Sequence, residues 1–211
     1  MACRDRLCGA GLGSRWVMDE LICGVDEAGR GAWAGPVLAG AVILGEAIPG
    51  MADSKALTAI QRQQLAQRIR RTALAWAVGV ASVAEIDGMN VLEATLLAMY
   101  RALCALPMVP QRLLVDGAVA CAVPACWGIQ AETLVGGDRW QPCIQAGAIL
   151  AKVTRDDLMA AVAVHYPAYG FSRHKGYGTM IHRQALLACG PCPQHRMTFA
   201  PVRLALRDRV P

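Results

Sequence analysis

The pattern of apolar and polar positions predicts a chain whose strands come early and alternate with helices. An apolar run at 21–25 indicates a buried strand, and a second run at 36–44 indicates the return strand of a hairpin. Small apolar residues at 73–83 predict another buried strand. Shorter strands are expected at 112–116 and, once or twice, within 121–135. These runs supply a sheet of four or more strands.

Helical periodicity appears in four places. Thr58 is expected to cap a helix over 59–71, and a longer helix opens at Gly88 or Asn90 and ends near residue 106. Further helices are predicted over 144–164 and from about 179 to 188, followed by a proline-rich tail. Strands interleaved with helices predict an α/β fold around a mixed sheet.

Composition places this sheet in one globular domain. The 211 residues are 55% hydrophobic and 18% charged, with a formal net charge of +5. We expect a loose N-terminal extension at 1–18 and a single domain over 19–211. The mild positive charge is compatible with a nucleic-acid partner. Residues 1–20 have no apolar segment typical of a signal peptide, and no run is long enough to cross a membrane, so no membrane association is expected.

Nine cysteines form no regular framework, and their number is odd. We interpret them as reduced thiols in a cytoplasmic protein. Cys189-Gly-Pro-Cys192 has the form of a redox tetrapeptide, but a predicted helix precedes it where that chemistry needs a strand. Zinc binding through these two thiols and His195 lacks a fourth ligand.

The candidate chemistry lies in acidic residues that follow strands or sit in glycine turns. They are Asp26 and Glu27, which are adjacent, Asp116 before a glycine, and Asp138 after one. Carboxylate oxygens are the ligands that Mg²⁺ and Mn²⁺ prefer. Each site alone is ordinary turn chemistry, and spacing in the sequence does not show that they converge.

Two glycine-rich segments accompany these acids. Gly29-Arg30-Gly31 leaves backbone N–H groups bare, so that a phosphate or sugar can approach closely. The segment 167–178 is a predicted loop dense in glycine, aromatic and basic residues. The four arginines of the 59–71 helix form either a solvated face or a ridge that contacts phosphates, and the sequence leaves both open.

The sequence resembles the ribonuclease HII family. The family signature Gly-hydrophobic-Asp-Glu-Ala-Gly-Arg-Gly, followed by Ala-Gly-Pro, matches residues 24–36 closely. Further blocks follow in the family's order, so the resemblance covers about residues 22–202. These blocks are Asp53-Ser54-Lys55, Glu85-Ile86-Asp87, Ala151-Lys152-Val153-Thr154-Arg155-Asp156, His174-Lys175-Gly176-Tyr177-Gly178-Thr179 and His195-Arg196-Met197-Thr198-Phe199.

The resemblance implies a ribonuclease H-like fold, with a central mixed sheet flanked by helices and a small C-terminal helical region. It implies an endonuclease that hydrolyses the RNA strand of RNA–DNA hybrids and cuts 5′ of single ribonucleotides in duplex DNA, leaving 3′-hydroxyl and 5′-phosphate ends. Such an enzyme removes ribonucleotides from DNA. A monomer is expected. The implied partners are the hybrid and the ribonucleotide-containing duplex.

The resemblance also assigns roles to residues of this chain. Two divalent ions, Mn²⁺ or Mg²⁺, would be held by Asp26, Glu27, Asp116 and Asp138, which are also the catalytic residues. The ribonucleotide would be read by Gly29, Arg30, Gly31 and Tyr177. Candidates for holding phosphates are Lys55, Lys152, His174 and Lys175.

Some positions depart from the family pattern or carry other interpretations. Ala148 stands where the family usually has Ser, and Ala32-Trp33 replaces Pro-Leu. Acidic residues 156 and 157 are interpreted as a salt-bridged helix turn, and His165 and His182 as structural. Rival hypotheses are a non-catalytic hybrid-binding protein, disfavoured because no carboxylate is lost, and a junction-cutting nuclease of the same fold.

Overall fold

The computed structural model describes residues 20–51 and 57–207 and has a five-stranded sheet at its centre. The strand order is β3-β2-β1-β4-β5; the first three strands pair antiparallel, whereas β1, β4 and β5 run parallel. The hairpin and the mixed sheet expected from the sequence are therefore confirmed. The strands are β1 (Ile22–Ala28), β2 (Val37–Ile43), β3 (Ala75–Ala81), β4 (Arg112–Asp116) and β5 (Ala131–Leu134).

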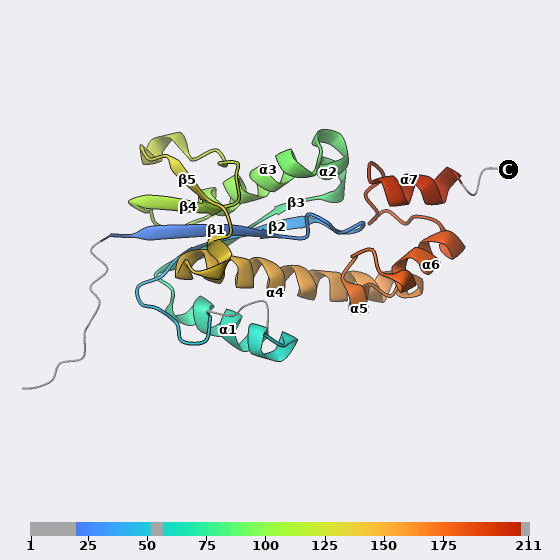
Figure 1. Ribbon diagram of the computed structural model, residues 1–211, viewed down its shortest axis with the longest axis horizontal. Coiled ribbons are helices and arrows are strands. Elements are labelled where there is room, and N and C mark those ends of the chain that lie inside the picture. The colour runs from blue at the N-terminus through green and yellow to red at the C-terminus, as the bar shows by residue number, and fades with distance from the viewer. Residues whose placement is uncertain (1–19, 52–56, 208–211) are drawn as a thin grey trace, which may run out of the picture.

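Helices cover both faces of the sheet (Figure 1). The long helix α4 packs on one face with α1 beside it, and α3 packs on the other face next to α2. The short helices α5, α6 and α7 gather at one end of the molecule. The helices are α1 (Ala59–Thr72), α2 (Val83–Met89), α3 (Val91–Cys104), α4 (Pro142–His165), α5 (Phe171–His174), α6 (Met180–Cys189) and α7 (Ala200–Arg207), with 3-10 turns at Ala125–Trp127, Gly137–Arg139 and Pro167–Tyr169.

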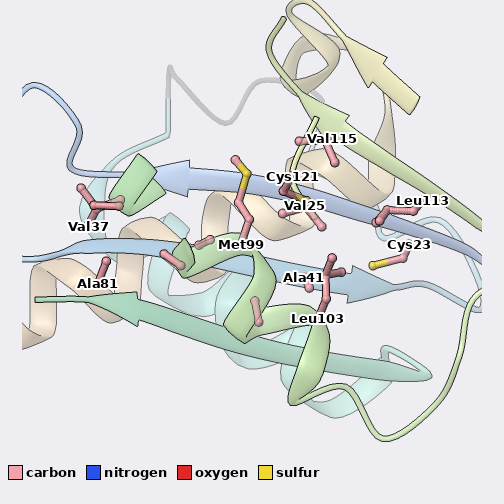
Figure 2. Packing of buried hydrophobic residues seen from close by; sticks show 14 of the residues in the cluster. Cys23, Val25, Val37, Ala41, Ala81, Met99, Leu103, Leu113, Val115 and Cys121 are labelled. Atoms are coloured by element: carbon pink, nitrogen blue, oxygen red, sulfur yellow. The ribbon is translucent and has the colours of Figure 1, made fainter. Parts of the chain in front are cut away.

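The main core lies between the sheet and α3 (Figure 2). Val25 of β1 and Leu113 of β4 meet Met99 and Leu103 of α3, and all four side chains are almost fully buried. Because neighbouring strand residues point to opposite faces, Asp26 must face α4 when Val25 faces α3. The apolar alternation in β1 thus decides where the first carboxylate points.

Two strand glycines, together with Gly147 of α4, allow α4 to lie close to the sheet. A Cβ on Gly24 would lie 2.2 Å from the backbone carbon of Cys143, and one on Gly40 would lie 2.3 Å from the carbonyl oxygen of Gly147. No larger residue fits at these two strand positions without moving the helix. The close approach holds the middle of α4 next to the C-terminal end of β1, where Asp26 and Glu27 lie.

The helix starts expected from the sequence are confirmed at two caps. The Thr58 side chain accepts from the Gln61 N–H in a capping box, and the Asn90 side chain accepts from the Leu92 and Glu93 N–H groups. Because a side-chain acceptor satisfies a free N–H at the first turn, these residues fix where α1 and α3 begin.

Several expectations were wrong in detail. Strand β3 is a half-exposed edge rather than a buried strand, since Trp76 and Val80 are 36% and 38% exposed. The single strand within 121–135 agrees with the expectation of one or two, but the 167–178 loop contains two short helical turns, and α2 and α7 were not predicted. Short helices carry too few turns to show periodicity. Residues 1–18 and Lys55 lie outside the described residues. Among those described, no helix is long and apolar enough to cross a membrane.

Candidate active site

A hollow of about 500 Å³ opens at the ends of β1 and β4, where the predicted carboxylates lie. All four of them line it, together with the glycine turn and residues of α1 and α4. The sequence could not show this convergence, and the fold supplies it. The lining residues are Asp26, Glu27, Ala28, Gly29, Arg30, Gly31, Arg62, Asp116, Asp138, Ala148, Ile149, Lys152 and Tyr177.

Strand register brings the first two aspartates together. The parallel pairing of β1 with β4 matches Val25 with Val115, so Asp26 and Asp116 occupy the next position on neighbouring strands. Both therefore point to the α4 face. Asp138 arrives from the 3-10 turn after β5, and its backbone N–H donates to the Asp116 Oδ1 at 3.4 Å. Three separate elements thus deliver carboxylates to one place.

Negative charge is concentrated around Asp26, which is only 7% exposed. Burial, followed by the nearby charges of Glu27, Asp116 and Asp138, raises the pKa of the Asp26 carboxyl well above its usual range. The Glu27 N–H donates to the Asp26 Oδ1 at 2.6 Å, and this hydrogen bond lowers the pKa of Asp26 by a smaller amount. A cation placed among these oxygens would relieve both the repulsion and the cost of burial.

The donor set fits a hard divalent ion in its chemistry, because every candidate ligand is a carboxylate oxygen. It is not already arranged as a closed cage. Within residues 20–51 and 57–207, no three His, Cys, Asp or Glu side chains stand ready to share an ion. Glu27 instead accepts from the Arg30 guanidinium at 3.2 Å. In this structure Glu27 is thus paired with a cation of the glycine turn.

The glycine turn has two glycines with different surroundings. Gly29 has a φ of +101°, and a Cβ there would lie 2.1 Å from the Nε of Arg155. Gly31 has no atom within 4 Å of its Cβ position, and its φ is not in the left-handed region. The fold itself requires glycine at position 29. At position 31 the bare backbone faces open space in the hollow.

Tyr177 enters the hollow from the loop between α5 and α6. Its ring centroid lies 5.4 Å from the Lys152 Nζ and 5.3 Å from the Arg155 Cζ, so two cations of α4 flank the ring. Lys152 also pairs with Asp156 at 2.7 Å, which confirms the salt-bridged helix turn expected for Asp156. The tyrosine is thus held over the α4 side of the hollow.

Buried histidines support the Tyr177 loop. The Gly176 N–H donates to the Nδ1 of His174, whose Nε2 then carries the proton and donates to the Tyr169 carbonyl at 2.8 Å. With both nitrogens occupied, the geometry favours a supporting role for His174 over the expected phosphate contact. The Lys175 Nζ donates to the Ser172 carbonyl, and neither residue 174 nor residue 175 lines the hollow.

His182 and His195 form a hydrogen-bonded pair that also supports this loop. The Cys192 N–H donates to the Nδ1 of His195, so the Nε2–H of His195 donates to the Nε2 of His182 at 3.0 Å. His182 then donates from Nδ1 to the Tyr177 carbonyl at 3.0 Å. Burial lowers the pKa of each ring to about 4, so both are neutral near neutral pH. The structural interpretation of His182 is confirmed.

The thiols of the Cys-Gly-Pro-Cys segment are not placed for redox chemistry. Cys189 ends α6 instead of preceding a helix, and burial raises the pKa of the Cys192 thiol. A redox thiol needs a lowered pKa and a helix N-terminus. Both cysteines are free thiols, and the Cys192 Sγ lies 3.2 Å from the His195 Nδ1, within the histidine network.

Arg62 of α1 was one of four arginines that the sequence left open as a solvated face or a ridge that contacts phosphates, and it was not singled out as a site residue. Its Nη2 donates to the Leu57 carbonyl, and its side chain lines the hollow. Ala148, the departure from the family's Ser, also lines it, so the missing hydroxyl would have faced the site.

Comparisons with known proteins agree with this geometry. Residues 23–202 match the family described as ribonuclease HII. Ribonuclease HII of Halorhodospira halophila is 51% identical over 187 residues, which cover 88% of this chain and 94% of that protein. The crystal structure of ribonuclease H2 from Pyrococcus horikoshii OT3 has a TM-score of 0.71 at 25% identity and covers 89% of this chain and 97% of that one.

Bst-RNase HIII in complex with Mn²⁺ has a TM-score of 0.68 at 18% identity, covering 92% of this chain and 71% of that one, a likeness of fold alone. The ribonuclease H-like fold expected from the sequence is confirmed.

Proposed function

This chain belongs to the ribonuclease HII family, endonucleases of RNA in RNA–DNA hybrids, and from that premise we propose that the carboxylate-lined hollow is its active site. The observation that carries the proposal is the meeting of Asp26, Asp116 and Asp138 from three elements beside a bare glycine turn. The substrates are the RNA strand of a hybrid and single ribonucleotides in duplex DNA, cut on their 5′ side.

Asp26, Glu27, Asp116 and Asp138 would hold two divalent ions, Mg²⁺ or Mn²⁺. Such ions would supply an activated water and neutralise charge on the leaving oxygen, consistent with 3′-hydroxyl and 5′-phosphate ends. Asp26 is the most buried of the candidate ligands. Its burial and the negative charges of its neighbours disfavour an ionised Asp26 that has no cation beside it, and so favour a bound cation. Glu27, which pairs with Arg30 in the structure, would be the fourth ligand.

The ribose is recognised by the glycine turn and Tyr177. The 2′-hydroxyl distinguishes RNA from DNA, and it both donates and accepts hydrogen bonds. Arg30 and Gly31 line the hollow, and the open Cβ position of Gly31 lets a ribose approach their backbone N–H groups. Tyr177, which also lines the hollow, offers a hydroxyl and a flat ring.

Phosphates on either side of the cut are held by cations that line the hollow. Lys152 and Arg62 supply these from α4 and α1. Such contacts set affinity and carry no sequence information, which suits an enzyme that reads only a sugar. Lys55, which lies outside the described residues, and Lys175 remain candidates from the family resemblance.

The cysteines bear on the cellular compartment of the protein. The seven described cysteines are free thiols, which supports the cytoplasm as the compartment. We propose that the chain acts as a monomer on hybrid or ribonucleotide-containing duplexes, where it begins the removal of ribonucleotides from DNA.

A labelled duplex with one embedded ribonucleotide tests the proposal directly. With Mn²⁺ or Mg²⁺ we expect a single cut on the 5′ side of the ribonucleotide, and with EDTA no cut. The same duplex made entirely of DNA is the control and should stay intact. Equal cutting of both duplexes, or no cutting with either ion, would contradict the assignment.

A further inference from the structure

Two arginines are completely buried behind the glycine turn. Arg155 of α4 and Arg196, which precedes α7, each have no exposed surface. A buried charge normally has a carboxylate partner. Across the described residues neither guanidinium has a carboxylate within ion-pair distance. Both groups instead donate to backbone carbonyl oxygens.

Arg196 holds the carbonyls of the glycine turn itself. It donates to the Gly29 oxygen at 2.7 Å and the Arg30 oxygen at 2.8 Å, and also to the carbonyl of Gly35 at 2.9 Å. A trans peptide is planar, with its C=O and N–H on opposite sides. Because Arg196 draws these two carbonyls inward, the N–H groups of Arg30 and Gly31 must point away from it.

Those two N–H groups have no acceptor in the part of the chain that the structure describes. They belong to residues that line the hollow. Hydrogen bonds polarise one another along a chain, so a cation on the carbonyl side makes each N–H a stronger donor. Arg196 therefore both aims the two donors at the substrate side and strengthens them.

Arg155 connects this turn to the Tyr177 loop. It donates to the carbonyls of Pro36 at 2.9 Å, Ala34 at 3.0 Å and Lys175 at 2.9 Å. It also fills the space beside Gly29, where a Cβ would overlap its side chain. One guanidinium thus bonds the segment just after the glycine turn to the loop that carries Tyr177, and it packs against the turn at Gly29.

The arrangement is expensive for stability. Burial, with the nearby Arg155 charge second, lowers the pKa of Arg196 to about 9. Apolar residues of similar volume would commonly leave a core equally stable or more so. What the two guanidinium groups provide, and apolar side chains cannot, is a fixed direction for several peptide groups at once.

We propose that Arg196 and Arg155 are positioning residues for ribonucleotide recognition. Arg196 sets the direction of the two backbone N–H donors at the 2′-hydroxyl, and Arg155 sets their distance from Tyr177. The inference rests on the proposed function, since it names how that site reads its substrate. It predicts that damage to either arginine impairs recognition of the ribose more than it impairs contact with phosphates.

The test uses Arg196→Lys and Arg155→Lys, which keep the charge and lose the planar fork. Two quantities are measured in Mn²⁺: kcat/KM on the single-ribonucleotide duplex, and the inhibition constant of the all-DNA duplex as a competitor. We expect kcat/KM to fall by about tenfold or more, the scale of a lost or misdirected hydrogen bond, with the inhibition constant within about twofold. Arg101→Lys, at a hydrogen-bonded arginine that does not line the hollow, is the matched control and should change neither.

Asp87→Ala covers the case in which the lysine variants fail to fold. Asp87 accepts from the Met197 N–H at 2.8 Å and the Thr198 N–H at 2.9 Å, and so anchors the segment after Arg196 while leaving that side chain intact. It should show the same selective fall in kcat/KM, smaller in size.

Unchanged kcat/KM in the folded variants, or an equal loss in both quantities, would overturn the positioning role. A wild-type protein that does not cut the duplex would instead reject the proposed function.

Discussion

Alanine at the two glycines of the turn should give opposite results, because one glycine serves the fold and the other serves the substrate. Gly29→Ala forces a φ of +101° on an L-residue and drives a methyl group into the Arg155 guanidinium, 2.1 Å away. The backbone strain costs about 1–3 kcal/mol, and each disturbed hydrogen bond to the buried charge costs about 1.5–3 kcal/mol. Gly29→Ala should therefore lose on the order of 3–6 kcal/mol of unfolding free energy.

Gly31→Ala has no such conflict inside the protein, since nothing lies within 4 Å of the new methyl. Its unfolding free energy should stay the same or rise by up to about 1 kcal/mol, because alanine restricts the unfolded chain. The methyl group occupies the hollow, however, and a displaced ribose should lower kcat/KM by about tenfold or more. Urea unfolding and cleavage of the single-ribonucleotide duplex measure the two effects. A destabilised Gly31→Ala, or a Gly29→Ala as stable as the wild type, would refute the reasoning.

Three further predictions concern the surroundings of the site. His182 and His195 have a folded-state pKa of about 4 against 6.5 for the ordinary group, so the unfolded state binds more protons between these values. The stability that the two neutral rings allow is therefore full above pH 6.5 and is lost as the pH falls toward 4. The loss of unfolding free energy is on the order of 2 kcal/mol for each ring at about pH 5. Urea unfolding as a function of pH would detect this loss, and a flat profile would contradict it. Tyr177→Ala should lose about 1–3 kcal/mol of transition-state stabilisation, with a larger loss on a single ribonucleotide than on a continuous hybrid. Tyr177→Phe separates the contribution of the hydroxyl from that of the ring. Equal small effects on both substrates would make the tyrosine a packing residue. Replacing Cys189 and Cys192 by Ser should leave activity within about threefold of the wild type, because a serine hydroxyl at position 192 can still donate to the His195 Nδ1. A large loss of activity in a folded variant would support a redox or metal-binding role for these cysteines.

The four carboxylates that line the hollow could be predicted from the sequence because each ends a recognisable strand or sits in a glycine turn. Asp26 and Asp116 follow apolar runs that become β1 and β4, and the family signature supplied their convergence. The register that places them side by side depends on pairing between strands far apart in the chain. Local patterning does not contain that information.

The positioning arginines could not be predicted in the same way. Arg155 lies in a helical segment beside acidic residues, which is the usual pattern of an exposed ion pair, and Lys152 does form such a pair with Asp156. Arg155 turns inward into space that glycine at position 29 leaves open in the folded protein. His174 likewise appeared as one more base in a basic loop, and its burial follows from the aromatic cluster around Phe171.

The central claim is that carboxylates from separate elements form one metal-dependent catalytic site. Asp116→Asn tests it most directly, because the change keeps the shape of a side chain at the end of β4 and removes its charge. We predict that cleavage of the single-ribonucleotide duplex in Mn²⁺ is abolished, while the affinity for that duplex is retained, since phosphate contacts dominate binding. Near-normal turnover by Asp116→Asn would contradict the four-carboxylate site.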